Sequence, residues 1–252
     1  MAADDRYTIP GSGGVLENKL GLTTQEGVDE AMNEAATTRW AIMVMEPIPD
    51  RLDIEYFRSI HRRLLSPVLD WAGEVRQRGD EVVAGGTGIV YARSEFFQNG
   101  LNDVFDTLAT EDYLKGLGTE EFAAKLADRW GYLTTVHPFR DGNTRTQSAY
   151  VDRLATRAGH PIDWQKVDVP TLRSLRLAAV TGSERPLAQY LGSVLLEPAG
   201  PNLRDQVRST LQFHRDLALP RESSRGIKFR LAEPLSDAPA PPEGHDGASA
   251  QP

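Results

Sequence analysis

The segment from Thr119 to Gly159 sets a polar run between two stretches that have the periodicity of buried helices. Before the run, apolar residues recur at helical spacing, namely Phe122, Leu126, Trp130 and Leu133. After it, the same spacing returns at Tyr150, Val151, Leu154, Ala155 and Ala158. Gly159 and Pro161 then give a stop signal. The pattern predicts a tight loop held between two core helices, an arrangement that keeps polar groups rigid.

The polar run itself, His137–Gln147, reads His-Pro-Phe-Arg-Asp-Gly-Asn-Thr-Arg-Thr-Gln. An imidazole that titrates near neutral pH is suited to act as a general base, and a carboxylate such as Asp141 suits magnesium. The backbone N–H groups at the start of the following helix favour phosphate, and Arg145 can fork onto phosphate oxygens. Phe139 is expected to point inward. An Asp-Gly-Asn triplet alone is usually a solvated turn, but the joint pattern indicates a site for a magnesium nucleotide.

Composition limits the class of protein. The chain has 252 residues, no cysteine and a formal net charge of −8. The missing cysteine excludes a disulfide scaffold, a thiolate zinc site and a cysteine nucleophile. The negative charge argues against a broad nucleic-acid-binding surface and a polybasic membrane anchor. The sequence has no apolar run of bilayer length and no signal-peptide order at its start. We therefore expect a soluble, cytoplasmic protein without nucleic-acid or membrane partners.

The rest of the chain is predicted to be helical almost throughout. Thr24, Asp53 and Ser94 stand where N-caps are expected, each before an apolar stripe. Further helices are expected at Leu172–Val180, Leu187–Leu195 and Leu203–Leu217. The exception is the stretch 75–92, where β-branched residues surround glycine clusters and predict a β-hairpin. On the residues alone, an ordinary surface hairpin remains open.

The run 137–147 resembles the signature of the Fic family, H-P-F-x-[D/E]-G-N-[G/K]-R, and departs from it at Thr144. The resemblance implies an all-α fold, a Fic-type helical bundle with a small β-hairpin flap beside the active site. It covers about residues 15–200. Around this domain we expect a flexible lead over residues 1–14, a helical extension over 201–232 and a disordered tail over 233–252.

Fic proteins are mostly protein adenylyltransferases, so the resemblance implies transfer of AMP from ATP to a hydroxyl of a target protein, with release of pyrophosphate. It implies ATP and Mg²⁺ as nucleotide and metal, and a partner protein that offers a Tyr, Ser or Thr hydroxyl. The roles that it implies are a general base at His137, a metal ligand at Asp141, an anion hole at Gly142, Asn143 and Thr144, and a phosphate grip at Arg145.

The resemblance also implies binding roles for two further segments. The stretch Asn18–Leu22 is similar to a short motif near the nucleotide in one branch of the family, so Lys19 and Leu20 are nucleotide-binding candidates. A solvated lysine is the alternative reading. In the flap, Gly85, Gly86 and Thr87 are candidates for binding a target segment by strand addition.

Departures from the family pattern leave alternatives open. Thr144 replaces the usual glycine and also the lysine of the Doc-like branch, which transfers the γ-phosphate of ATP. Ser148 replaces a second arginine found in many members. A Doc-like protein phosphotransferase and a non-catalytic Fic scaffold therefore remain alternatives. The inhibitory motif [S/T]-x-x-x-E-[G/N] does not occur in the chain, so we expect any inhibitor to be a separate, antitoxin-like protein, as in a toxin–antitoxin pair.

Overall fold

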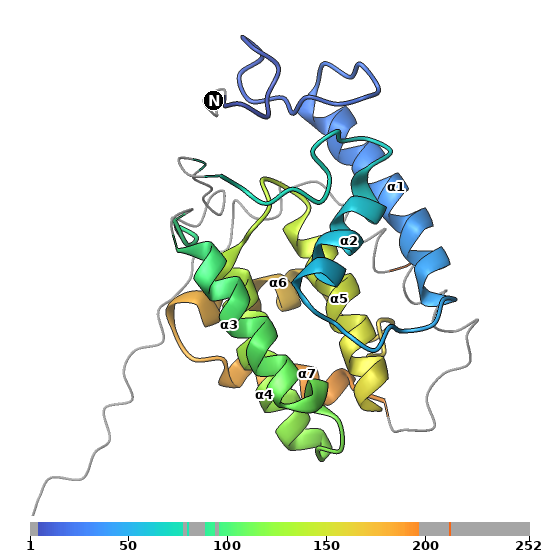
Figure 1. Ribbon diagram of the computed structural model, residues 1–252, viewed down its shortest axis with the longest axis vertical. Helices are drawn as coiled ribbons and strands as arrows, with labels where there is room; N and C mark the ends of the chain where they lie inside the picture. Colours follow the sequence, from blue (N-terminus) through green and yellow to red (C-terminus); the bar gives the residue numbers. More distant parts are fainter. Residues whose placement is uncertain (1–4, 78–79, 81–88, 94–95, 197–211, 213–252) are drawn as a thin grey trace, which may run out of the picture. The chain divides into compact units, whose positions relative to one another are not determined.

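The computed structural model describes residues 5–77, 80, 89–93, 96–196 and 212, and within them the protein is all-α, as predicted (Figure 1). The helices run in the order α1 (Gln25–Val44), α2 (Ile54–Leu65), α3 (Phe97–Thr110), α4 (Thr119–Val136), α5 (Asn143–Ala158), α6 (Val169–Thr181) and α7 (Arg185–Val194). A short 3₁₀ helix, η1 (Asp112–Leu114), precedes α4. The described residues also form isolated antiparallel β-bridges, such as the one between Thr8 and Leu16.

The predicted helix ends are largely confirmed. The Thr24 side chain accepts a hydrogen bond from the N–H of Gly27 at 3.2 Å and caps α1. Asp53 caps α2 in the same way, because its carboxylate accepts from the N–H of Tyr56 at 3.0 Å. α5 ends at Gly159, which has a left-handed φ of +88° that glycine adopts at low cost. The prediction that Ser94 caps α3 is wrong: Ser94 lies outside the described residues, and α3 begins after Phe96, which occupies the N-cap position without a side-chain cap.

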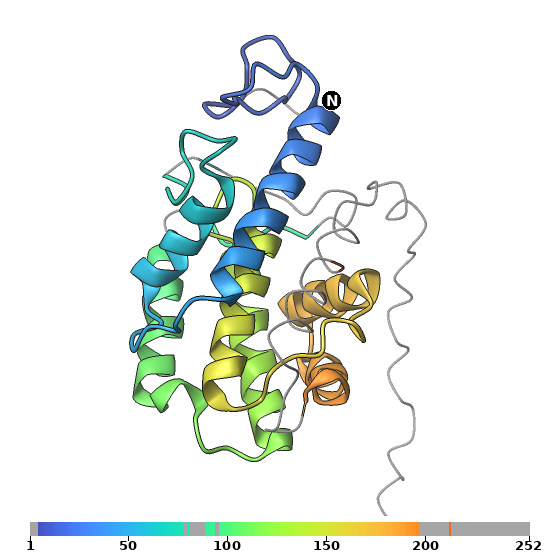
Figure 2. The ribbon, with the colours of Figure 1, turned by 90° about the vertical axis from the view of Figure 1, so that its right-hand side faces the viewer.

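The helices α4 and α5 form the centre of the fold. α4 packs against α3, α6 and α7, and α5 packs against α2 and α4. Figure 2 shows α6 and α7 together on one side of these two helices. The α4 stripe predicted from the sequence is buried: Phe122, Leu126 and Trp130 have no exposed surface. The turn that joins α4 to α5 is therefore supported by well-packed helices at both of its ends.

Several expected segments fall partly or wholly outside the described residues. Gly85, Gly86 and Thr87 of the expected flap are among them, as are the boundaries at residues 200 and 232 and nearly all of the helix expected at 203–217. The structure describes two stems of the expected flap. The first stem comprises residues 75–77 and 80, and the second comprises residues 89–92. In the expected flexible lead, the side chains of Tyr7 and Thr8 are buried. Across the described part of the chain, none of the helices has the length and apolar character to span a bilayer.

Candidate active site

The polar run forms a closed turn between α4 and α5, as the sequence predicted. α4 ends at His137, which adopts a left-handed backbone conformation with φ +46°, and α5 begins after Gly142, with φ +77°. The Asn143 side chain accepts from the N–H of Phe139 at 2.9 Å and donates to its carbonyl at 2.7 Å. Phe139 points inward and is fully buried, and its ring stacks on His61 with centroids 3.9 Å apart. The turn is therefore fixed by both a side-chain clamp and core packing.

The first turn of α5 presents free donors. Its first backbone hydrogen bond runs from the N–H of Thr146 to the carbonyl of Gly142, at 3.0 Å. The N–H groups of Asn143 and Thr144 therefore have no acceptor within the helix. The N–H of Gly142 donates to the carboxylate of Asp141 at 2.6 Å. Unpaired N–H groups and the positive end of the helix dipole favour an anion such as phosphate at this place.

Arg145 and Asp141 lie side by side at the mouth of this turn. Their closest charged atoms are 3.7 Å apart, and their side chains keep 13% and 19% of their surface exposed. Arg145 also donates to Asn33 Oδ1 of α1, at 2.9 Å from Nε and 2.5 Å from Nη2. The site therefore places a guanidinium beside a carboxylate, and both side chains remain partly accessible to solvent. Asn33 is a contact that sequence reasoning missed, because it comes from a distant helix.

The carboxylate of Asp141 fits magnesium shared with a nucleotide. Within the described residues, no group of three or more His, Cys, Asp or Glu side chains forms a closed metal cage. Mg²⁺ does not need such a cage, since it usually binds one or two carboxylates and completes its shell with phosphate oxygens and water. A partly exposed carboxylate beside phosphate-binding N–H groups meets that requirement.

The imidazole of His137 lies flat against the ring of Tyr91. The two ring centroids are 3.6 Å apart and the ring planes differ by 7°. Burial lowers the pKa of His137 well below its ordinary value of 6.5, and the positive charges of Arg76 and Arg176 act in the same direction. The carbonyl of Thr134 raises the pKa of His137, but this is the smallest of the effects. The imidazole is therefore neutral at neutral pH, the state that a general base needs.

Arg76 holds the backbone under His137. This arginine is buried, with 1% of its surface exposed. Its guanidinium donates to the carbonyls of Val136 at 3.0 Å and His137 at 2.9 Å, which are orphan acceptors at the end of α4. It also donates to the carbonyls of Asp80 at 2.8 Å and Ala92 at 3.0 Å, one in each stem of the expected flap. One side chain thus ties both stems to the end of α4.

His61 supports the other half of the turn, which sequence reasoning did not foresee. Its Nδ1 accepts from the N–H of Gly73 at 2.7 Å, so the ring proton is on Nε2, which bonds the carbonyl of Asp141 at 2.9 Å. Burial lowers the pKa of His61 to about 4. The available signal was its position four residues after Phe57 in an apolar stripe, since a histidine buried there needs partners for both nitrogens.

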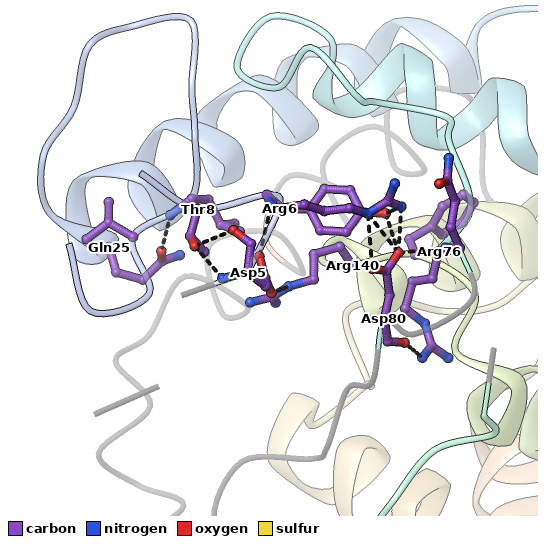
Figure 3. Close-up of polar contacts among 12 residues, drawn as sticks. Asp5, Arg6, Thr8, Gln25, Arg76, Asp80 and Arg140 are labelled. Atoms are coloured by element: carbon purple, nitrogen blue, oxygen red, sulfur yellow. Dashed lines mark hydrogen bonds and ion pairs between the residues drawn. The ribbon is translucent and has the colours of Figure 1, made fainter. Parts of the chain in front are cut away.

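The segment before α1 reaches both the turn and the flap stem (Figure 3). Asp5 forms an ion pair with Arg140 of the polar run at 2.6 Å. Arg6 pairs with Asp80 at 2.5 Å, and the hydroxyl of Tyr7 donates to the same carboxylate at 2.9 Å. Burial, followed by the hydrogen bond to Asp80 and the negative charge of that residue, raises the pKa of Tyr7 to about 12. These contacts connect the first described residues with the edge of the site.

The two nucleotide-binding candidates near the N-terminus contact a different segment. Lys19 donates to the carbonyl of Ser66 at 2.9 Å and pairs with Asp70 at 3.2 Å. Both partners belong to the stretch that follows α2. Leu20 is 54% exposed. The approach of Lys19 and Leu20 to a nucleotide therefore stays a prediction.

Comparison with known proteins identifies the domain. Residues 51–155, which include α2 to α4 and most of α5, match the model of the Fic/DOC family. The chain carries a Fic domain. The N-terminal Fic domain of a Bartonella effector protein (Bep) from Bartonella sp. AR 15-3 superposes with a TM-score of 0.70 at 25% identity, over 75% of this chain and 90% of that one. BepC of Bartonella tribocorum, solved with bound AMPPNP, gives a TM-score of 0.69 at 25% identity, over 76% and 96%.

Curated relatives of this Fic domain are named protein adenylyltransferases. The protein adenylyltransferase VbhT of Bartonella schoenbuchensis is 31% identical over 171 residues, which is 66% of this chain and 34% of VbhT. The chain thus spans about a third of that relative. The probable protein adenylyltransferase Fic of Escherichia coli K12 is 26% identical over 193 residues, which is 77% of this chain and 93% of the relative.

Proposed function

We propose that this protein is a protein adenylyltransferase, which transfers AMP from ATP to a hydroxyl side chain of a target protein. The observation that carries the proposal is the α4–α5 turn, which brings His137 at the end of α4, the neighbouring Asp141 and Arg145, and the N–H groups of Asn143 and Thr144 into one short segment. The names of the relatives and the AMPPNP bound to BepC support the same activity.

The reaction assigns a role to each group in the turn. The target hydroxyl oxygen attacks the α-phosphorus of ATP, the bond from that phosphorus to the bridging oxygen breaks, and pyrophosphate leaves. His137 takes the hydroxyl proton, which its neutral imidazole allows. The N–H groups of Asn143 and Thr144, together with Arg145, hold the phosphate oxygens on which negative charge develops.

Asp141 would hold the magnesium ion. When bound, Mg²⁺ neutralises phosphate charge and fixes the geometry of the triphosphate. The carboxylate is positioned for this by two contacts of its own residue, because its side chain accepts from the N–H of Gly142 at 2.6 Å and its carbonyl bonds His61 at 2.9 Å.

Thr144 is compatible with this activity. A glycine is required where the backbone is left-handed, but Thr144 lies in the first turn of α5 and is not among the residues with positive φ. Its N–H therefore points like that of any residue at this helix position. Ser148 is fully buried and supplies no guanidinium, so the proposal assigns the phosphate contacts to Arg145 and to the N–H groups of α5.

The proposed partner is a protein that presents a Tyr, Ser or Thr hydroxyl and binds at the flap, including Gly85, Gly86 and Thr87, by strand addition. A separate antitoxin-like inhibitor is part of the same proposal, because the sequence carries no inhibitory motif of its own.

The test incubates the protein and its His137→Ala variant with magnesium and a cell lysate, using ATP labelled at either the α- or the γ-phosphate. We expect protein labelling from α-labelled ATP only, and a rate about 10²–10⁴-fold lower in the variant, which is the usual contribution of a general base. Labelling from γ-labelled ATP only would assign the chain to the phosphotransferase branch. The absence of any labelling would favour the scaffold.

A further inference from the structure

The imidazole of His137 has only a weak orienting contact on its buried nitrogen. A catalytic histidine is normally held by a partner on the nitrogen that does not take the proton. In His137 the atom Nδ1 is buried and forms no hydrogen bond of good geometry among the described residues, and the nearby carbonyl of Thr134 has only a small effect on the ring. The opposite ring edge, which carries Nε2, is left for the incoming hydroxyl. A further contact is therefore needed to keep the ring from rotating about its side-chain torsions.

The ring of Tyr91 occupies the face of this imidazole. The near-parallel stack at 3.6 Å and 7° covers one face of His137 while both ring edges stay clear of Tyr91. Tyr91 cannot move freely itself, because it is 8% exposed and packs with Leu177 of α6 and with Ile89. The neighbouring N–H of Ala92 donates to the carbonyl of Thr135 in α4 at 2.8 Å, which fixes the second flap stem beside the end of that helix.

Arg76 fixes the backbone of His137. The Arg76 guanidinium donates to the carbonyl of His137, and the backbone N–H of Arg76 donates to the carbonyl of Pro138 at 2.8 Å. These two bonds hold the left-handed backbone of His137. Such a backbone conformation is uncommon for a residue other than glycine and persists only where the surroundings hold it. Arg76 stands on the first flap stem and Tyr91 on the second.

We propose that Tyr91 is a positioning residue, whose ring holds the imidazole of His137 in its reactive orientation, with Arg76 fixing the backbone beneath it. The two flap stems are therefore part of the catalytic apparatus as well as the base of a target-binding element. A target that binds to the flap and thereby steadies its stems also steadies the base. The inference rests on the proposed function, and it adds Tyr91 to the residues that set the rate of AMP transfer.

The test separates the ring stack from the hydroxyl and from general stability. Tyr91→Phe keeps the flat ring, and Tyr91→Leu removes it while keeping an apolar side chain. Tyr132→Leu is the matched control, because Tyr132 lies on the same helix as His137 but is 39% exposed. For each variant we would measure the kcat and KM of labelling from α-labelled ATP, the melting temperature and the ¹H resonance of the His137 ring, assigned by its loss in His137→Ala.

The expected result is a kcat about 10²-fold lower for Tyr91→Leu, the scale of a misplaced catalytic group, with KM for ATP unchanged. Tyr91→Phe should restore kcat, and Tyr132→Leu should match the wild type. The His137 resonance should be shifted upfield by the neighbouring ring in the wild type and in Tyr91→Phe, and should lose that shift in Tyr91→Leu.

An unshifted His137 resonance in the wild type would overturn the proposal. Labelling by Tyr91→Leu at or above the wild-type rate would also overturn it, and a faster rate would show that Tyr91 shields the histidine. Failure of the proposed function has a different signature. In that case no protein, wild type or variant, labels the lysate, while the upfield resonance remains in the spectrum.

Discussion

At the scale of single residues, the site depends on groups that are held in one protonation state by burial. His61 and His137 are both kept neutral in this way; His137 begins the α4–α5 turn, and His61 of α2 contacts the turn at Asp141. Both nitrogens of His61 are hydrogen-bonded, whereas Nδ1 of His137 has no hydrogen bond of good geometry among the described residues, and we assign its Nε2 to the chemistry. This difference separates a histidine that supports the turn from the one that we assign as the base.

The pKa of His61 predicts how stability depends on pH. The unfolded chain binds a proton at this residue near pH 6.5, whereas the folded chain does so only near pH 4. Acidification through this window therefore favours the unfolded state, and stability is retained above it. Between pH 7 and pH 5 the contribution is about 2 kcal/mol. Urea unfolding of the wild type and of His61→Gln should show that the variant loses less stability over this interval, by about that amount. Equal losses in the two proteins would contradict the account.

At the scale of elements, α5 is the part on which the phosphate site depends. Gly142 precedes it with a φ of +77°, and a side chain there would meet Leu65 and approach His61 Nε2 to 3.1 Å. The close contact with α2 thus fixes where α5 begins. The orientation of its free N–H groups follows from that placement.

Gly142→Ala should therefore weaken the binding of Mg-ATP by about tenfold, or about 1.4 kcal/mol, since the clash with Leu65 displaces the start of α5 from its position. The left-handed backbone of an alanine adds a loss of stability of about 1–2 kcal/mol. Gly159→Ala is the matched control at the other end of the same helix. Gly159 is equally left-handed, with φ +88°, but an added Cβ would meet nothing within 4 Å. Both variants should lose stability, and only Gly142→Ala should lose affinity in calorimetric titration with Mg-ATP. Equal affinities would show that the start of α5 does not bind the nucleotide.

Local signals in the sequence were sufficient for the helices and for the turn. Thr24 and Asp53 were found as caps because a capping side chain acts on N–H groups only two or three residues away. Asn33, Arg76 and Tyr91 were not found, since their contacts join segments that are far apart in the sequence. The role of His61 could not be predicted either, because its partners at Gly73 and Asp141 cannot be inferred from spacing.

At the scale of the whole molecule, nucleotide binding should stabilise the fold, because only the folded chain assembles the turn. At a ligand concentration of 100 times Kd the gain is about 2.7 kcal/mol, or roughly 5–10 °C in Tm for a chain of this size. Mg-ATP should give this shift and ATP with a chelator a smaller one. Asp141→Asn should remove the effect of magnesium, whereas Asp103→Asn, an exposed carboxylate on α3, should keep it. A magnesium effect that survives in Asp141→Asn would place the metal elsewhere.

The central claim is that the α4–α5 turn attaches AMP to a protein hydroxyl with His137 as the base. Mass spectrometry of peptides from a lysate treated with the protein, magnesium and ATP tests this most directly, with His137→Ala treated in parallel. The account predicts peptides that carry adenosine monophosphate on a Tyr, Ser or Thr side chain and that are lost in the variant. Phosphate in place of AMP on those peptides, or undiminished AMP in the variant, would contradict it.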